Sequence, residues 1–86
     1  MRRVYTCVVD ESVLRLFTSC RTGDRDELLR IFSRLGDNPF QKGDYTQKTA
    51  SLREVQVKRF GKWFVTFWPD HGECELRIVE VKRLVT

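Results

Sequence analysis

Hydrophobic and polar residues alternate through the last third of the chain, and this alternation predicts three β-strands. They fall at residues 52–59, 62–68 and 74–81, and each is rich in β-branched or aromatic side chains. Gly61 marks the turn between the first two strands, and the segment P-D-H-G at 69–72 marks the next. Strands joined by such short turns must pair as antiparallel neighbours.

The first half of the chain has a different spacing, which predicts a strand at residues 3–9 followed by two helices at 10–20 and 24–36. Each predicted helix begins at an aspartate that can cap it, and the second has a glutamate three residues later, as in a capping box. The second helix carries an apolar stripe at 28, 29, 31, 32 and 35, which we expect in the core. Residues 45–49 fit either a loop or the start of a strand.

The predicted order is therefore β-α-α-β-β-β, an α+β fold formed by residues 1–86 as one domain. Two helices joined by a short turn make a helical hairpin. We expect this hairpin to pack on one face of an antiparallel twisted sheet. The first strand must also find a partner within that sheet.

Alternation also assigns the faces of the predicted strands. Val55 and Val57 are expected to face the helices, whereas Glu54, Gln56 and Lys58 are expected to face solvent or a ligand. The next strand is apolar on both sides, which fits either a strand covered on both faces or an exposed aromatic patch that marks a binding site. Its two sets are Trp63, Val65 and Phe67, and Phe64, Thr66 and Trp68.

Composition narrows the classes of function. The 86 residues are 41% hydrophobic and 33% charged, as in soluble globular proteins, and the net charge of +4 favours an acidic partner such as RNA, DNA or an acidic protein. Three cysteines without a CxxC pair and a single histidine indicate a reduced cytoplasmic protein without a structural zinc site. No apolar run approaches the ~20 residues of a membrane span. We expect a cytoplasmic protein that binds no membrane and needs no cofactor.

The segment R-F-G-K-W-F-V-T-F, followed by V-E-V-K-R, carries a resemblance. Together with the element order and the basic charge, it resembles the RelE/ParE superfamily of toxins from bacterial type II toxin–antitoxin modules. The order covers nearly the whole chain, and the motif covers residues 52–83. The resemblance implies a four-stranded twisted sheet with a helical hairpin on one face, and a cognate antitoxin that wraps the toxin and sets its oligomeric state. It implies metal-independent cleavage of mRNA in the ribosomal A site for RelE-like members, and inhibition of DNA gyrase for ParE-like members.

Two positions depart from the RelE-like pattern. Many RelE-like sequences have an arginine directly after the aromatic of the third strand, where this chain has Phe64 after Trp63, and no tyrosine follows Arg83. The terminal basic pair, Lys82 and Arg83, matches best. The favoured function is a growth-inhibiting toxin that acts as a ribosome-dependent mRNA interferase and so inhibits translation. The alternatives are a gyrase inhibitor without nuclease activity, which Phe64 favours, and a small RNA-binding module without toxicity.

Arg83, Lys58 and Glu54 are the candidate catalytic residues. Cleavage of RNA through its 2′-hydroxyl needs a proton acceptor and cations that stabilise the phosphate. Arg83 and Lys58 are candidates for the phosphate contacts, or else charges at a strand edge, and Glu54 is a candidate base, or else an ion-pair partner of Lys58. The candidate RNA-binding residues are cations and aromatics that can stack on bases or pack beneath an antitoxin: Arg59, Lys62, Lys82, Phe64 and Trp68.

Overall fold

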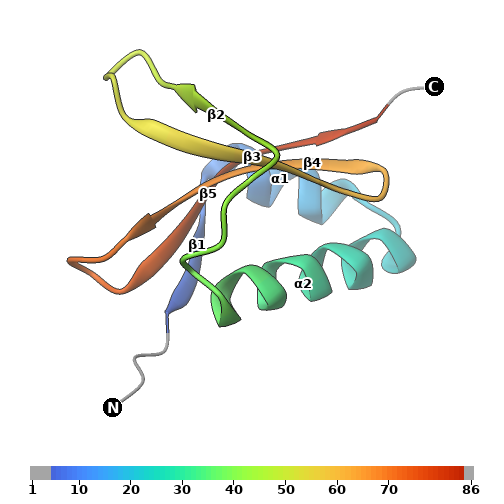
Figure 1. The fold of residues 1–86 in the computed structure, drawn as a ribbon. Helices are drawn as coiled ribbons and strands as arrows, with labels where there is room; N and C mark the ends of the chain where they lie inside the picture. The colour runs from blue at the N-terminus through green and yellow to red at the C-terminus, as the bar shows by residue number, and fades with distance from the viewer. Residues whose placement is uncertain (1–4, 85–86) are drawn as a thin grey trace.

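Two helices cover one face of a twisted five-stranded sheet in the computed structural model, which describes residues 5–84 (Figure 1). The α+β class and the helical hairpin are confirmed. The elements in chain order are β1 (Thr6–Val9), α1 (Glu11–Ser19), α2 (Thr22–Asp37), β2 (Tyr45–Lys48), β3 (Glu54–Phe60), β4 (Trp63–Asp70) and β5 (Glu75–Arg83). The additional strand, β2, occupies the segment that the sequence left open. The predicted start of the first strand, at residues 3 and 4, lies outside the described residues.

The sheet has the order β1-β5-β4-β3-β2, so β4 is its central strand. The strands β3, β4 and β5 form the expected antiparallel meander. β1 pairs with β5 in parallel, with Cys7 opposite Leu76, so the sheet is mixed rather than wholly antiparallel. The long connection between these two strands, which includes the helical hairpin, permits parallel pairing, whereas a tight turn cannot join parallel neighbours. β1 and β2 are the two edges.

A β-bulge interrupts the pairing of β4 with β5. Thr66 lies opposite Glu80, and the next residue, Phe67, lies opposite Ile78, so Val79 has no direct partner. The extra residue in β5 restores the match between the apolar sides of the two strands. β4 also continues to Asp70, so the turn begins later than the predicted 69–72.

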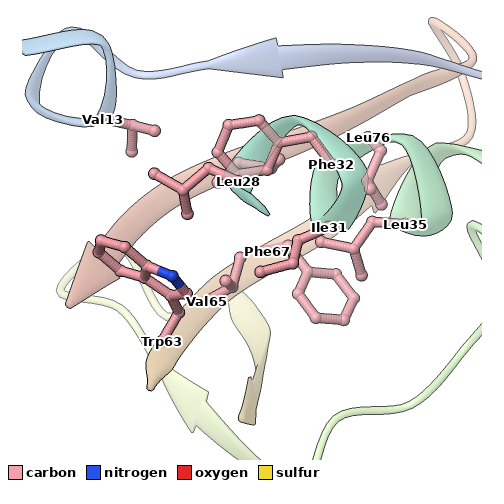
Figure 2. Close-up of a cluster of buried hydrophobic side chains, with 10 residues drawn as sticks. Val13, Leu28, Ile31, Phe32, Leu35, Trp63, Val65, Phe67 and Leu76 are labelled. Carbon is pink, nitrogen blue, oxygen red and sulfur yellow. The ribbon is translucent and has the colours of Figure 1, made fainter. Parts of the chain in front are cut away.

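The hydrophobic core lies between the helices and the covered face of β4 and β5 (Figure 2). Trp63, Val65 and Phe67 of β4 are at most 1% exposed, and side chains from both helices pack onto them. The predicted stripe on α2 is confirmed except at Leu29, which is 52% exposed. The other core members are Val13, Leu28, Ile31, Phe32, Leu35, Leu76 and Ile78.

The orientation predicted for β3 is wrong. Val57 lies opposite Thr66, and directly paired residues share a face, so Val57 and its alternation partner Val55 lie on the face away from the helices. Both valines are nevertheless buried. The polar set, Glu54, Gln56 and Lys58, therefore lies on the helix side.

A covering loop explains how polar residues of β3 are accommodated on the helix side. The loop between α2 and β2 runs beside β3, where the side chain of Gln56 accepts a hydrogen bond from the Gly43 N–H, and Lys58 donates one to Gln41. Alternation separates the two faces of a strand but does not say which face the helices cover. A strand away from the centre of the sheet can therefore bury its apolar side on either face.

The predicted caps are also corrected. α2 begins at Thr22, so Asp24 lies inside its first turn and not at the cap, and the cap position, Arg21, makes no capping hydrogen bond from its side chain. Asp10 does precede α1, but without a capping hydrogen bond from its side chain. Asp24 instead accepts a hydrogen bond from Lys62, in the turn between β3 and β4. Neither helix of the described residues is long and apolar enough to cross a membrane.

Candidate nucleic-acid interface

A row of cation, aromatic ring and cation crosses the open face of the sheet, the face that the helices leave uncovered. Phe64 of β4 lies opposite Arg59 of β3 on one side and opposite Lys82 of β5 on the other. Paired residues on one face of an antiparallel sheet have their Cβ atoms about 5 Å apart. Phe64, which is partly exposed, therefore lies between two exposed basic residues.

A hollow of about 170 Å³ lies beside this row on the open face. Pockets that enclose a whole small ligand begin at about 300 Å³, so this hollow fits one group of a larger ligand. Lys82 Nζ lies 3.1 Å from Glu80 Oε1 at its rim, and both side chains are well exposed. The lining residues are Tyr45, Gln47, Val57, Phe64, Thr66, Glu80 and Lys82.

The hollow includes residues that the sequence reasoning missed. Tyr45 belongs to β2, whose existence the sequence left open, so no signal placed its ring on this face. Glu80 was accessible to prediction, because it lies two residues from Lys82 on the same side of β5, whereas the alternation had already placed Thr66 on the side of Phe64 and Trp68. Together they add a carboxylate and a hydroxyl to a basic and aromatic surface.

Trp68 lies at the other end of β4 on the same open face, with two arginines beside it. The guanidinium carbon of Arg53 is 3.7 Å from the centre of the Trp68 ring, and that of Arg77 is 5.7 Å away. Arg77 lies opposite Trp68 in β5 and also forms ion pairs with Glu75 and Asp70, at 2.8 and 3.5 Å. Four of the five predicted RNA-binding residues thus share the open face.

The fifth, Lys62, lies with Arg83 at an end of the helix-covered side. Lys62 Nζ is 2.6 Å from Asp24 Oδ1, and Arg83 Nη1 is 3.4 Å from Asp24 Oδ2. The hydrogen bond from Lys62, together with the charges of Lys62, Arg83 and Arg21, lowers the pKa of Asp24 although partial desolvation opposes this. Glu27 adds a second carboxylate, 3.8 Å from Lys62.

A cavity of about 740 Å³ opens beside this ion-pair cluster, where the turn between the helices meets the end of β5. It is large enough for a small ligand. Arg21, Asp24 and Arg83 line the cavity. Lys62 and Glu27 belong to the adjoining ion-pair cluster. Its apolar wall comes from Leu16 and Trp63.

The three candidate catalytic residues are not joined to one another. Lys58 donates a 2.9 Å hydrogen bond to Gln41 and lies 5.3 Å from the centre of the Phe60 ring. Arg83 pairs with Asp24, and Glu54 begins β3 opposite Lys48. Within residues 5–84 no ion pair links Glu54 with Lys58, the pairing considered as the alternative to catalysis. In the same part of the chain, no three His, Cys, Asp or Glu residues gather as metal ligands would.

Comparison with solved structures identifies the fold. The chain has a TM-score of 0.72 and 13% identity to a chain of the RelE–RelB complex from Pyrococcus horikoshii, over 94% of this chain and 96% of that chain. It has a TM-score of 0.71 and 14% identity to a chain of the toxin–antitoxin complex RelBE2 from Mycobacterium tuberculosis, over 94% and 99%.

The isolated RelE toxin of Escherichia coli is similar to the same degree, with a TM-score of 0.71 and 11% identity over 95% of this chain and 86% of that one. No protein-family model matches the sequence, and no curated protein matches it either. The fold of this chain is therefore that of RelE toxins, as the sequence resemblance implied. The sequence identity is too low to transfer functional residues from those structures to this chain.

Proposed function

We propose that this chain is the toxin of a type II toxin–antitoxin module and that it inhibits translation in the cytoplasm by cleaving mRNA at the ribosome. The observation that carries the proposal is the Arg59–Phe64–Lys82 row on the open face of a RelE fold. A cognate antitoxin is the expected protein partner, since two of the similar structures are complexes of RelE-type and RelB-type chains.

The open face supplies the groups that hold an RNA strand. Arg59 and Lys82 contact phosphates, and Phe64 stacks on an unpaired base between them. Glu80, half exposed and 3.1 Å from Lys82, is suited to accept the 2′-hydroxyl proton as the 2′-oxygen attacks the phosphorus, and the Lys82 ammonium is suited to donate a proton to the 5′-oxygen that leaves. No step requires a metal ion, because the cations of the protein stabilise the phosphate. The ribosome orients the mRNA.

Arg83, Lys58 and Glu54 remain candidates on the opposite, helix-covered side of the sheet. Arg83 is 57% exposed and held by Asp24 at 3.4 Å, a weak contact from which it can turn to a phosphate. Lys58 has a neutral partner, Gln41, and forms no ion pair with a carboxylate of residues 5–84 that would compete with a phosphate. Glu54 is exposed at the start of β3. Each would have to reach the RNA around the edge of the sheet.

Induction in bacteria tests the proposal. Wild-type chain should arrest growth, co-expression of the adjacent gene should restore it, and primer extension should show new mRNA ends within codons. The Arg59→Ala/Lys82→Ala variant should lose this effect, whereas Arg15→Ala/Arg30→Ala, which removes two exposed charges from the helices, should keep it. Normal growth with the wild-type chain soluble and abundant would refute the toxin proposal.

Phe64 favours one second function, inhibition of DNA gyrase without nuclease activity. Many RelE-like sequences place an arginine at the corresponding position of the motif, and a phenyl ring cannot stabilise a phosphate as a guanidinium does. Intact mRNA together with accumulating gyrase–DNA cleavage complexes after induction would establish this alternative. RNA binding without growth arrest would instead indicate the non-toxic module.

A further inference from the structure

The open face repeats one arrangement at two places along β4. Phe64 lies between Arg59 and Lys82, and four residues later Trp68 lies beside Arg53 and Arg77. Because side chains two and four residues apart in a strand share a face, both rings point the same way. A rise of about 3.3 Å per residue separates them by about 13 Å.

Arg53 is the cation beside Trp68 that forms no ion pair within residues 5–84. Its guanidinium carbon lies over the Trp68 ring, 3.7 Å from the ring centre, in a close cation–π contact. No carboxylate of residues 5–84 forms an ion pair with Arg53, whereas Arg77 already has Glu75 and Asp70. Two hydrogen bonds with Thr49 hold the main chain of Arg53 at the end of the β2–β3 connection, but they do not hold its side chain.

We propose that Trp68 is a second base-stacking site, so that single-stranded RNA lies along β4 with one unpaired base on Phe64 and another on Trp68. In the unbound protein, the Arg53 guanidinium occupies the place of that base. When RNA binds, the base replaces it on the indole ring, and Arg53 turns to the adjacent phosphate. The exchange is favourable because both groups are planar and Arg53 gains a charged acceptor.

The geometry selects an unpaired strand over a duplex. Rings that accept a base need its face free, and in a duplex every face is stacked on the next pair. The two rings stand on one strand with cations on either side, which suits a chain of alternating bases and phosphates. This inference rests on the proposed function for its choice of RNA, but it concerns binding by the isolated protein and needs neither ribosome nor toxicity.

Tryptophan fluorescence reads the site directly. The chain has two tryptophans, and Trp63 is only 1% exposed, so quenching by a bound base reports Trp68. The probe is a single-stranded RNA of mixed sequence and about 8 nucleotides, within the site size of small single-strand-binding domains. We expect saturable quenching with this RNA and none with the same sequence annealed to its complement.

Two variants separate stacking from charge. Trp68→Ala should weaken RNA binding by about 5- to 100-fold, as loss of one stacked base does, without changing the slope of log affinity against log salt. Trp68→Phe should retain most of the affinity. Arg53→Ala should weaken binding less but reduce that slope by about one unit, since it removes one phosphate contact. Arg30→Ala, an exposed arginine of α2, is the control and should leave both unchanged.

The outcomes distinguish this inference from the proposed function. Binding that falls in Arg59→Ala/Lys82→Ala but not in Trp68→Ala would overturn the second stacking site alone. Equal binding of duplex RNA, or saturable RNA binding without quenching, would overturn it as well. Failure of the chain to arrest growth, with quenching and the Trp68→Ala loss intact, would refute the toxin proposal and leave the stacking site standing.

Discussion

Lys82 and Arg83 are neighbours in β5, yet their side chains lie on opposite faces of the sheet. Lys82 lies opposite Phe64 on the open face, and Arg83 lies opposite Trp63 on the helix side, where it contacts Asp24. The basic pair that best matched the RelE/ParE pattern is therefore divided between two surfaces. Single substitutions can test these surfaces separately.

The first prediction concerns Arg83. Arg83→Ala should lose growth inhibition while the protein stays folded, since an exposed side chain at a strand end adds little stability. Arg83→Lys should recover part of the activity, because lysine keeps the charge but not the two-pronged grip. Growth curves after induction and thermal unfolding of the purified variants provide the measurements.

Asp24→Asn is the matched variant for Arg83, since it keeps the arginine but removes its partner. If Arg83 contacts phosphate, this variant should bind RNA at least as tightly as wild type. Parallel losses of activity and of melting temperature in Arg83→Ala and Asp24→Asn would show instead that Arg83 only fastens β5 to α2.

The second prediction concerns acid. Because Lys62 and its neighbours lower the pKa of Asp24 in the folded protein, the carboxylate stabilises the fold above the unfolded pKa of about 3.9. That contribution disappears as the pH falls through the lower, folded-state pKa. Between about pH 5 and pH 2, wild type should therefore lose more melting temperature than Asp24→Asn does.

Glu11→Gln is the control for acid stability. Glu11 also forms an ion pair, with Arg15 at 2.6 Å, but both side chains are at least 75% exposed, so this pair should add little. Glu11→Gln should follow the wild-type curve. If Asp24→Asn followed it too, the Asp24–Lys62 contact would have no measurable effect on folding.

The third prediction compares two phenylalanines of β4 that face opposite ways. Phe67 is fully buried against the helices, so Phe67→Ala should lower the free energy of unfolding by about 3–5 kcal/mol. Phe64 is partly exposed on the open face, so Phe64→Ala should cost only about 1 kcal/mol but should weaken RNA binding. Urea denaturation and RNA titration measure both. A large loss of stability in Phe64→Ala would mean that the open face is a second core.

The fourth prediction separates Lys58 from the loop that it holds. Lys58→Ala should reduce mRNA cleavage if Lys58 contacts a phosphate, whereas Gln41→Ala removes its 2.9 Å hydrogen-bond partner but keeps the cation and should leave cleavage unchanged. Primer extension after induction of each variant provides the measurement. Equal losses in both variants would assign Lys58 a structural role in positioning the loop between α2 and β2.

Local patterns predicted the elements of the fold well. The helical stripe on α2 and the alternation in β3 and β5 arise from burial on one side of an element, so the local sequence of each element is enough to show them. β2 was undecided because all four of its residues are exposed, and an exposed edge strand has no buried side to create a pattern. The capping box of α2 failed because the partner that Asp24 uses, Lys62, is 38 residues away.

The sequence predicted the types of residue at the candidate site but not how they are arranged in space. The sequence by itself determined which residues carry cations and rings, and that neighbours in a strand alternate between its faces. Only the tertiary structure decided which face the helices cover, and with it that Arg59, Phe64 and Lys82 form one surface while Lys62 and Arg83 belong to another. The physical reason is that strand alternation is local, whereas pairing register and helix packing depend on contacts between residues far apart in the chain.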